Sequence, residues 1–592
     1  MPKQILSGNE AVARGAWEAG VRVAAAYPGT PSTEILENIA EYRDDLYATW
    51  TNNEAIAAEL AFGAAVGGMR SLTAMKHVGM NVAADPIFSG AYAGVNGGMM
   101  IVSADDPGCH SSQNEQDNRL YAEHAKLIML EPADSQECLD FTKAAYELSE
   151  KYDMLTLLRL TTRVCHSKSV VELGERIAVE TKPYNGDWTK YVVLPVNARR
   201  RHILLEENIA RLRADGYDSP LNRVELNADT SVGVISSGIS YQHSREAFGD
   251  TVSYLKLGIT FPICDRLVRD FAAKFSKIVV IEEGEPYLST RIKAMGIAAD
   301  APDFVQGELN AARIRAVFGL DGGGEKADAS GLPDAPARPP VLCAGCPHRG
   351  FFYALSKRKG RFVGVGDIGC YTLGVNPPFN GMDICICMGS GFAIPIGLSR
   401  ALETQGDTRR VFGFVGDSTF FHSGFNSLVD AVHQRANVCL VVLDNSITAM
   451  TGHQENAHTE KDLQGYQVPA IPIERLVLAT GLDTSRLIEV DPIDQTAMGN
   501  AIDAGLTNEG VTVIITRRPC ALLKDEIKAR GTKHCEVAAD KCIGCKACMK
   551  IACPALAFNE SAKMAYVADT ANCTACGLCK QMCKVGAISE VR

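Results

Sequence analysis

Short apolar runs alternate with amphipathic or small-residue segments along most of this chain. Apolar runs at 21–26 and 99–103 predict strands, and the Ala/Gly-rich stretch 54–68 predicts a helix suited to close packing. The same alternation returns from 231 to 320. Strands alternating with helices are typical of open parallel sheets. We therefore predict two α/β units within residues 1–320.

The second half of the chain adds three further segments. Residues 321–340 are rich in Gly, Ala, Pro and Asp, which is the composition of a linker. A third α/β pattern follows, and then a tail dense in cysteine. The predicted domain order is 1–165, 166–320 (a polar connecting stretch and the second α/β unit), linker 321–340, 341–525 and 526–592.

Composition changes this picture only slightly. The 592 residues are 46% hydrophobic and 22% charged, as in ordinary globular proteins, and the net charge of −11 argues against nucleic acid or an anionic membrane as partner. No apolar run approaches the ~18 residues of a membrane span, and the start lacks the apolar core of a signal peptide. We expect a soluble, cytoplasmic protein. In such a large chain, the 20 cysteines indicate metal chemistry rather than disulfides.

Eight of the cysteines form two similar runs in the tail. The first is Cys542-x2-Cys545-x2-Cys548-x4-Cys553-Pro554, and the second is Cys573-x2-Cys576-x2-Cys579-x3-Cys583. In bacterial ferredoxins three thiolates of such a run hold one cubane, and the fourth comes from the other run. The predicted [4Fe-4S] ligands are therefore Cys542, Cys545, Cys548 and Cys583 for one cluster, and Cys553, Cys573, Cys576 and Cys579 for the other.

Two details of the tail depart from the bacterial ferredoxin run. Four residues rather than three precede Cys553, and Lys584 stands where proline would follow Cys583. The alternative is a pair of zinc knuckles, whose Cys-x2-Cys halves look alike. Zinc gives no reason for a third two-residue step or for the doubled pattern, so iron–sulfur clusters are favoured.

A second motif lies in the third α/β pattern. The apolar strand 411–416 leads into Asp417, an amphipathic helix follows, and the apolar strand 438–443 ends at Asp444-Asn445. A right-handed crossover places both strand ends at the same sheet edge, where open α/β sheets bind ligands. Carboxylate, amide and carbonyl oxygens suit Mg²⁺.

This spacing resembles the thiamine-diphosphate motif, in which Gly-Asp-Gly is followed at a distance by Asn. The resemblance implies that Asp417 and Asn445 bind Mg²⁺ through their side chains and Ile447 through its main-chain oxygen, and that the metal holds the diphosphate. Ser418 replaces the second glycine after Gly416, which costs ~1 kcal/mol if that position needs a positive φ. The alternative is an ordinary strand–turn pair with polar ends.

A carboxylate in another α/β unit should complete such a site. In thiamine enzymes a glutamate binds the aminopyrimidine ring, so that the amino group can deprotonate the thiazolium. Glu54 opens the small-residue helix and is the best candidate for this catalytic role, with Glu59 the competing choice. A glutamate in a first helical turn can also serve only the helix dipole.

Several motifs together resemble the 2-oxo acid:ferredoxin oxidoreductases, and most nearly the alpha-subunit family of the indolepyruvate ferredoxin oxidoreductases. They are the turn Tyr27-Pro28-Gly29-Thr30-Pro31-Ser32, the segment Cys343-Ala-Gly-Cys346-Pro-His348-Arg349, the stretch 416–424, the stretch 443–452 and the tail. The resemblance covers essentially the whole chain. It implies that the cofactor-binding residues are Thr30, Glu54, Gly416, Asp417, Ser418 and Asn445.

The implied fold is α/β multidomain. It has doubly wound parallel-sheet domains that bind thiamine diphosphate, the pyrimidine-binding one at 1–165 and the diphosphate-binding one at 341–525. A transketolase C-terminal-like α/β domain lies within 166–320, and a ferredoxin-like α+β domain with two [4Fe-4S] clusters forms 526–592.

The implied reaction is the oxidative decarboxylation of an aryl pyruvate such as indolepyruvate, with coenzyme A as acyl acceptor and ferredoxin as electron acceptor. The implied partner is a smaller beta subunit in an α2β2 assembly. Pyruvate or 2-oxoglutarate as substrate, a non-oxidative 2-oxo acid decarboxylase and an inactive electron-transfer or scaffold subunit remain as alternatives.

The resemblance also raises a third cluster. In the related pyruvate and 2-oxoglutarate enzymes, a Cys-x2-Cys pair, a later cysteine and one after the last strand hold a cluster near thiamine. Here the matching residues are Cys343, Cys346, Cys370 and Cys520. The alternative is that Cys343 and Cys346 only shape a loop, because indolepyruvate enzymes are usually assigned the two tail clusters alone.

Overall fold

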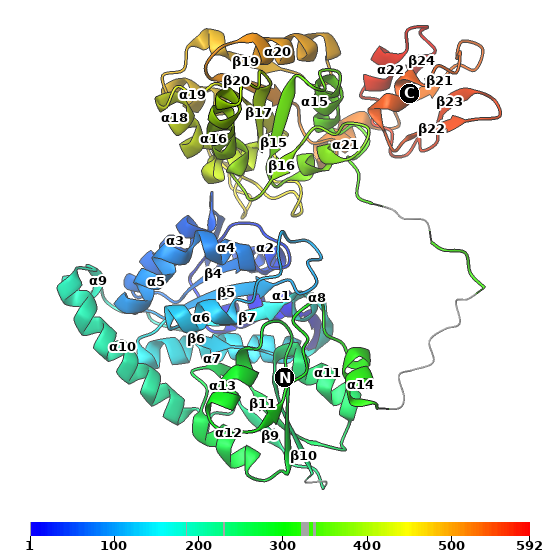
Figure 1. Cartoon of the computed structure of the whole chain (residues 1–592). Helices are drawn as coiled ribbons and strands as arrows, with labels where there is room; N and C mark the ends of the chain where they lie inside the picture. The colour runs from blue at the N-terminus through cyan, green and yellow to red at the C-terminus, as the bar shows by residue number, and fades with distance from the viewer. Residues whose placement is uncertain (1, 185, 229–230, 321–330, 336–338, 592) are drawn as a thin grey trace. The chain divides into compact units, whose positions relative to one another are not determined.

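The computed structural model describes residues 2–184, 186–228, 231–320, 331–335 and 339–591. The chain forms two compact units, and Figure 1 colours it along its length. Unit 1 comprises Met1–Leu332 with Leu463–Gly465, and unit 2 comprises Pro333–Asp462 with Tyr466–Arg592. Most of the predicted linker 321–340 lies outside the described residues. In the described part of the chain, each helix is too short or too polar to cross a bilayer.

The first sheet of unit 1 has seven strands in the order β12-β6-β7-β5-β4-β2-β3. All neighbours run parallel except β12 and β6. The strands are β2 (Val23–Ala26), β3 (Tyr47–Trp50), β4 (Ser71–Lys76), β5 (Met99–Asp105), β6 (Ile128–Leu130), β7 (Thr156–Thr161) and β12 (Ile259–Phe261). The two runs predicted as strands thus form β2 and β5.

Both faces of this sheet are buried, because alternate residues of β5 enter different cores. Met100 and Val102 join one core, and Met99 and Ile101 join the other. The first core is covered by the helices α1 (Gly8–Glu18), α2 (Thr33–Ile39) and α7 (Ser135–Tyr152). The second is covered by α3 (Glu54–Val66) and α5 (Ala84–Ala93).

A second sheet in unit 1 has the order β14-β13-β10-β11-β9, with only β9 antiparallel to its neighbour. Its strands are β9 (Arg223–Glu225), β10 (Val232–Ser237), β11 (Ser253–Leu257), β13 (Lys277–Ile281) and β14 (Ala299–Asp300). Ile235 and Leu255 belong to the same core as α3 and α5, so the two sheets share one apolar layer. The polar stretch before this sheet contains a 21-residue helix, α10 (Pro195–Asp215), that the sequence left unassigned.

Unit 2 contains a six-stranded, wholly parallel sheet in the order β16-β15-β17-β18-β20-β19. Helices α15 (Pro347–Ser356) and α20 (Gln495–Thr507) cover one face, and α16 (Ser390–Thr404) and α18 (Phe425–His433) cover the other. The strands are β15 (Phe362–Gly366), β16 (Ile384–Cys385), β17 (Arg410–Gly416), β18 (Val438–Asp444), β19 (Leu487–Val490) and β20 (Thr512–Arg517).

The tail is a small α+β module that packs on the α15–α20 face. Strand β21 (His534–Val537) pairs with β24 (Ile588–Val591), and β22 (Leu556–Asn559) pairs with β23 (Met564–Val567). The short helix α22 (Leu578–Met582) lies within the second cysteine run and contains Cys579. Ile551, Leu556 and Leu578 share one core with Phe351 of α15. The predicted architecture of parallel-sheet units followed by a small α+β module is confirmed.

Candidate functional site

Three oxygen atoms meet at the carboxyl edge of the unit 2 sheet, where β17 and β18 end. The side-chain oxygen of Asn445 lies 3.1 Å from Oδ1 of Asp417 and 2.7 Å from the main-chain oxygen of Ile447. None of the three can donate a hydrogen bond in this orientation. Adjacent oxygens around octahedral Mg²⁺ are about 2.9 Å apart, because the metal–oxygen distance is about 2.0–2.1 Å. The donor set therefore fits Mg²⁺, whereas an amide turned by 180° would hydrogen-bond both partners instead.

Asp417 is held with one oxygen free for this cluster. Its Oδ2 accepts a 3.0 Å hydrogen bond from the side-chain amide of Asn456. Burial, followed by the nearby carboxylate of Asp444, raises the pKa of Asp417 to about 7, and a bound cation would oppose that shift. Ser418, in place of the second glycine, lies in the short helix α17 (Asp417–Thr419) and needs no left-handed backbone.

A second carboxylate, Asp367, follows β15 at the same edge and is fully buried. It accepts backbone N–H groups from Gly389 and Gly391, which fixes the turn that begins α16. Burial raises the pKa of Asp367 to about 7. The positive end of the 15-residue helix α16 is thereby set at the carboxyl edge of the sheet, an arrangement suited to a diphosphate.

Asp444, the residue before Asn445, is fixed by charges on both sides. Arg517 donates to its Oδ2 at 2.8 Å, and the His458 ring lies 3.3 Å from the same oxygen. Although burial opposes it, these two partners lower the pKa of Asp444. The same contact, more than any other, raises the pKa of His458 to about 9. This network fixes the end of β18 and so the position of Asn445.

The matching edge in unit 1 carries Thr30 after β2 and Glu54 at the start of α3. Asn53, not Glu54, caps α3 by accepting the N–H of Ile56. The carboxylate of Glu54 is buried against Gly79, where an added Cβ would lie 2.9 Å from Oε1. Thr30 is half-buried and follows Gly29.

Lys76, at the end of β4, joins this edge and was not singled out from the sequence. Its side chain lies over Gly29 and donates to the main-chain oxygen of Ser111 at 3.0 Å. Burial lowers the pKa of Lys76 below its ordinary value. The nearby carboxylates of Asp106 and Glu54 oppose this shift but do not cancel it. The lysine therefore links the turn before Thr30 with the charge of Glu54.

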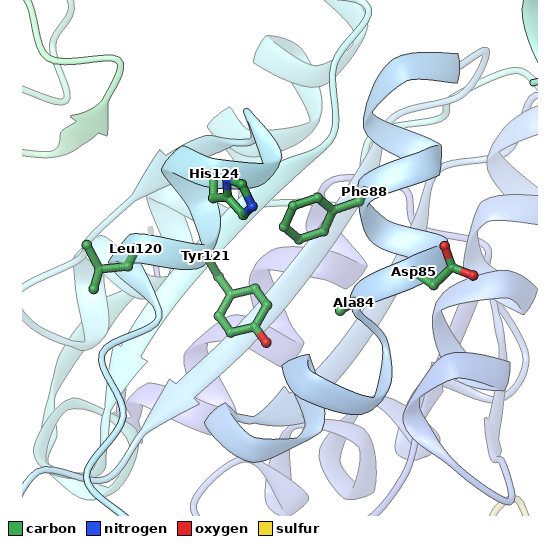
Figure 2. Close-up of a pocket in the computed structure, with 6 residues that line it drawn as sticks. All are labelled: Ala84, Asp85, Phe88, Leu120, Tyr121 and His124. Atoms are coloured by element: carbon green, nitrogen blue, oxygen red, sulfur yellow. The ribbon is translucent and has the colours of Figure 1, made fainter. Parts of the chain in front are cut away.

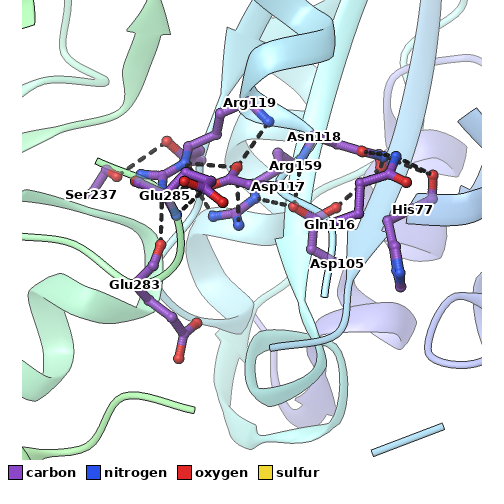
Figure 3. A network of polar contacts seen from close by, with 12 residues as sticks. His77, Asp105, Gln116, Asp117, Asn118, Arg119, Arg159, Ser237, Glu283 and Glu285 are labelled. Atoms are coloured by element: carbon purple, nitrogen blue, oxygen red, sulfur yellow. Dashed lines mark hydrogen bonds and ion pairs between the residues drawn. The ribbon is translucent and has the colours of Figure 1, made fainter. Parts of the chain in front are cut away.

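A buried polar network fixes the loop after β5 (Figure 3). The guanidinium of Arg159 donates hydrogen bonds to the carboxylate of Asp105 at 2.9 Å and to that of Glu131 at 2.8 Å. Arg119 bonds Glu282 at 2.9 Å, next to the second sheet. From this loop the amide of Asn118 donates to the main-chain oxygen of His77 at 3.0 Å, so the network reaches the end of β4.

An open depression of about 630 Å³ also lies on unit 1, between α5 and α6 (Arg119–Ala125). Figure 2 shows the ring of Phe88 facing Tyr121 and His124 across it. The ring centroids are 6.3 Å and 5.0 Å apart, respectively. None of the residues predicted for the site lines this depression.

Each predicted set of tail cysteines lines its own cavity. Both cavities are formed in the tail, but only one also borders the loop before α15. The first cavity is lined by Cys553, Cys573, Cys576 and Cys579 together with Cys346 and Cys535. The second is lined by Cys542, Cys545, Cys548 and Cys583. Each of the two crossed ligand sets predicted from the sequence therefore borders one cavity.

The thiols surround space rather than one point. Within the described residues, no group of three or more His, Cys, Asp or Glu side chains is arranged to hold a single metal ion. Zinc draws four thiolates to about 2.3 Å from one centre, whereas a cubane keeps them apart around an iron–sulfide core.

Cys343, Cys346, Cys370 and Cys520 form a third, looser group. Burial raises the pKa of Cys370 to about 11, and the nearby thiols of Cys520 and Cys343 add to the shift. Burial likewise raises the pKa of Cys346 to about 12. Cys520 also faces the ring of His453, at 3.6 Å. The four thiols are therefore close enough to influence one another.

Sequence reasoning missed Asp367, Lys76, Asn456 and the positions of Arg349 and Cys535. For Asp367 and Lys76 a signal existed, since Asp367 directly follows the buried strand β15 and Lys76 is the last residue of the buried strand β4. The others depend on contacts between distant segments and give no local pattern.

Comparisons with known families agree with this geometry. The family described as thiamine pyrophosphate enzyme, C-terminal TPP binding domain, matches residues 367–516. The family described as pyruvate flavodoxin/ferredoxin oxidoreductase, thiamine diP-bdg, matches residues 14–209. The 4Fe-4S binding domain matches residues 566–589. Thiamine-binding domains and a [4Fe-4S]-type module, as predicted, are thereby confirmed.

Curated relatives match nearly the whole chain. Indolepyruvate oxidoreductase subunit IorA of Methanothermobacter thermautotrophicus is 39% identical, covering 99% of this chain and 97% of its own. The subunit of the same name from Archaeoglobus fulgidus is 38% identical, covering 100% and 98%. Among solved structures, 2-oxoglutarate:ferredoxin oxidoreductase from Magnetococcus marinus is 18% identical over 54% of this chain and 65% of that chain, with a TM-score of 0.45, too low to support an argument.

Proposed function

This chain belongs to the family of indolepyruvate oxidoreductase IorA subunits, and from that premise we propose that it catalyses the thiamine-diphosphate-dependent oxidative decarboxylation of an aryl pyruvate. The proposed substrate is indolepyruvate, and the products are an aryl-acetyl-CoA, CO2 and reduced ferredoxin. The family and its domain matches support the thiamine-dependent oxidation of a 2-oxo acid. The aryl preference rests on the names of the relatives.

One observation carries the proposal. The compact unit that holds the oxygen cluster of Asp417, Asn445 and Ile447 also holds two cavities, each lined by one of the two predicted sets of four cluster cysteines. A decarboxylase without an oxidation step needs no electron exit, and an electron-transfer scaffold needs no Mg²⁺–diphosphate site. Both features together favour an oxidoreductase.

The proposed roles follow from the contacts of each residue. Asp417, Asn445 and the main chain of Ile447 would hold Mg²⁺, while Gly416 and Ser418 shape the turn around it. When bound, thiamine diphosphate supplies the electron sink for cleavage beside the substrate carbonyl. Glu54 is the proposed catalytic carboxylate that holds a proton at the aminopyrimidine, and its burial makes that hydrogen bond strong.

The tail is proposed to hold two [4Fe-4S] clusters on the crossed ligand sets. The third group, Cys343 with Cys346, Cys370 and Cys520, stays a proposed set of ligands for a further cluster. An iron count near eight per chain, at four per cluster, would correspond to the two tail clusters alone. A count near twelve would assign the third group as cluster ligands.

The proposed partners are a smaller beta subunit, in an α2β2 assembly, and ferredoxin. The word subunit in the names of the relatives motivates the first of these. Coenzyme A and the 2-oxo acid are the proposed small-molecule substrates.

The test is anaerobic reduction of a viologen dye by the chain co-purified with its small subunit, coenzyme A, Mg²⁺ and thiamine diphosphate. Indolepyruvate, phenylpyruvate, pyruvate and 2-oxoglutarate would be compared. Asp417→Ala should abolish both thiamine binding and dye reduction. Asp407→Ala, which removes a surface ion pair with Arg409 and a hydrogen bond from the backbone N–H of the same residue, is the matched control and should leave both within about twofold.

Each outcome has a definite reading. Fast reduction with indolepyruvate that requires Asp417 supports the proposal. Reduction with pyruvate or 2-oxoglutarate alone keeps the mechanism and removes the aryl preference. CO2 release without dye reduction indicates the non-oxidative decarboxylase, and bound clusters without thiamine indicate the scaffold.

A further inference from the structure

The two cysteine-lined cavities of the tail have different neighbours. The cavity of Cys542, Cys545, Cys548 and Cys583 is lined only by residues between 537 and 588. The cavity of Cys553, Cys573, Cys576 and Cys579, here called the inner cavity, is also lined by Ala344, Gly345, Cys346 and Arg349. The inner cavity thus borders the loop that leads into α15 of the thiamine-binding domain.

Arg349 is the charged residue at this border, and it is 2% exposed. Its NH1 donates to the main-chain oxygens of Ile551 at 2.7 Å and Ala552 at 2.5 Å. Its NH2 donates to the main-chain oxygen of Cys343 at 3.0 Å and to that of Leu342. The guanidinium therefore bridges the loop before α15 and the residue that precedes Cys553.

All of these acceptors are neutral. In the part of the chain that the structure describes, no carboxylate pairs with Arg349, and the groups that act on its charge are the thiols of Cys553, Cys346, Cys576 and Cys343. A buried cation without a counter-charge is costly. An anion bound on the side of the thiols would supply the counter-charge that Arg349 lacks.

One donor of Arg349 points to the same conclusion. Its Nε is buried and has no hydrogen-bond partner among the described residues, although both terminal nitrogens are fully used. A buried N–H without an acceptor is uncommon and unfavourable. Arg349 lines the inner cavity together with the cluster cysteines, so a sulfur atom of a bound cluster, thiolate or inorganic sulfide, would supply the acceptor that is missing.

We propose that Arg349 donates its Nε–H to the cluster in the inner cavity and, through its charge, raises the midpoint potential of that cluster above that of the other. Each cluster takes up one electron, and reduction adds a negative charge that the guanidinium stabilises. Net charge and hydrogen bonds to sulfur are established determinants of cluster potential. The inference rests on the proposed function, because it assumes that the tail holds clusters.

The cavity of Cys542, Cys545, Cys548 and Cys583, here called the outer cavity, has no buried cation among the described residues that line it. Its lining lysine, Lys546, is about half exposed and pairs with Glu560 at 2.7 Å. Water and the glutamate screen this charge, whereas Arg349 is buried and its described neighbours are main-chain oxygens and the ring of Phe379 rather than a carboxylate. The cluster next to the thiamine-binding domain should therefore be reduced first.

The first test is a redox titration of the anaerobic holoenzyme with dithionite, followed by electron paramagnetic resonance. In Arg349→Gln, one cluster signal should need a potential about 59 mV lower for half-reduction, which is a tenfold change in its reduced-to-oxidised ratio. For the other cluster signal, the reduced-to-oxidised ratio at a given potential should change by less than about twofold. Arg349→Lys keeps the charge and should show the smaller shift of the two variants. Lys546→Gln, the matched control, should leave the inner signal in place.

The second test needs no variant that could misfold. Holoenzyme labelled with ¹⁵N-arginine should show a ¹⁵N coupling to one reduced cluster by electron–nuclear double resonance. Unshifted potentials in Arg349→Gln with the full iron count, or no ¹⁵N coupling in the native enzyme, would overturn the inference. A purified protein that binds no iron would instead overturn the proposed function, so the failure of the inference and the failure of the proposed function are distinguishable.

Discussion

Glu54 and Glu59 lie one helical turn apart, and their surroundings separate them. Glu54 is buried at the carboxyl edge of the sheet, whereas Glu59 is exposed on the same helix. The sequence named both because both are glutamates near the start of a small-residue helix. Choosing between them required the fold, since burial of α3 against the sheet decides which carboxylate water can reach.

Replacement of Glu54 by glutamine should therefore lower kcat about 10²–10⁴-fold, the usual contribution of a positioned acid or base. Glu59→Gln, the matched control on the same helix, should stay within about twofold. The measurement is dye reduction with saturating 2-oxo acid, with thiamine affinity determined alongside. Equal losses in both variants, or none in Glu54→Gln, would remove Glu54 from its proposed role.

Glu283 belongs to the network in Figure 3, where buried carboxylates outnumber the two arginines. Burial raises its pKa from an ordinary value of 4.5 to about 7. Between these values the unfolded chain loses the proton before the folded chain does. The folded state then binds more protons, so stability falls as pH rises through this window.

Glu283→Gln mimics the protonated form and still accepts the N–H of Leu309. Its free energy of unfolding should match that of the native chain near pH 5 and exceed it by about 1–3 kcal/mol near pH 8. Denaturant unfolding at both pH values measures the difference. The exposed Glu285→Gln is the control. A difference that is constant with pH, or that shrinks as pH rises, would contradict the assignment of a neutral carboxyl.

At the scale of elements, local patterns predicted the strands better than the helices. The buried strands β5, β17 and β18 are continuous apolar runs because both faces of a parallel sheet are covered. Only four of the 21 residues of helix α10 are buried, and its apolar residues are spread over several faces, since Val196, Ile203 and Leu204 are exposed. Its sequence therefore carries almost no amphipathic signal. Asp417 and Asn445 were predictable because a βαβ crossover fixes where parallel strands end.

Gly345 is an element-scale constraint, because it joins the loop before α15 to the second cysteine run. Its φ is +71°, and an added Cβ would lie 2.0 Å from Oγ1 of Thr574, next to Cys573. Gly586 has a similar φ of +64° but nothing within 4 Å of such a Cβ. Comparing alanine variants of these two glycines therefore separates the cost of backbone strain from the cost of steric overlap.

Gly586→Ala should destabilise the chain by about 1–2 kcal/mol through strain alone. Gly345→Ala should cost a further 1–3 kcal/mol or so, because the loop and the tail must move apart. Thermal unfolding of the holoenzyme compares the two. Thr574→Ala should recover part of the loss in Gly345→Ala but none in Gly586→Ala. Equal destabilisation of the two glycine variants would show that the loop does not press on the tail.

Across the whole molecule, the proposed chemistry is divided between separate segments. Each segment could be predicted from the sequence by itself, but the contacts between the segments could not. Cysteine spacing and the Asp417–Asn445 pair are local motifs, and each was predicted from its own neighbourhood. The link between them was not, since Arg349 and Ile551 are 202 positions apart. Likewise, Arg119 and Glu282 are 163 positions apart. Such contacts depend on how the sheets and the tail pack, which no short pattern encodes.

This division of labour predicts that carbon chemistry and electron exit can be uncoupled. The double variant Cys573→Ser, Cys576→Ser should lose the inner cluster while leaving Glu54, Asp417 and Asn445 untouched. It should bind thiamine diphosphate normally, release about one CO2 per active site from the 2-oxo acid, and then stop, because the inner cluster, the proposed first acceptor of the electrons, is missing. Rapid-quench measurement of labelled CO2, beside dye reduction, tests this.

The decarboxylase alternative predicts a different course for the same variant. An enzyme without an oxidation step would keep turning over and release an aldehyde, since nothing in its cycle passes through the tail. Continued turnover with aldehyde formation in the native enzyme as well would favour that alternative. Aldehyde in the variant alone would mean that the oxidation step normally intercepts the carbon chemistry. A single burst of CO2 without aldehyde fits only an active site whose cycle must end in the clusters.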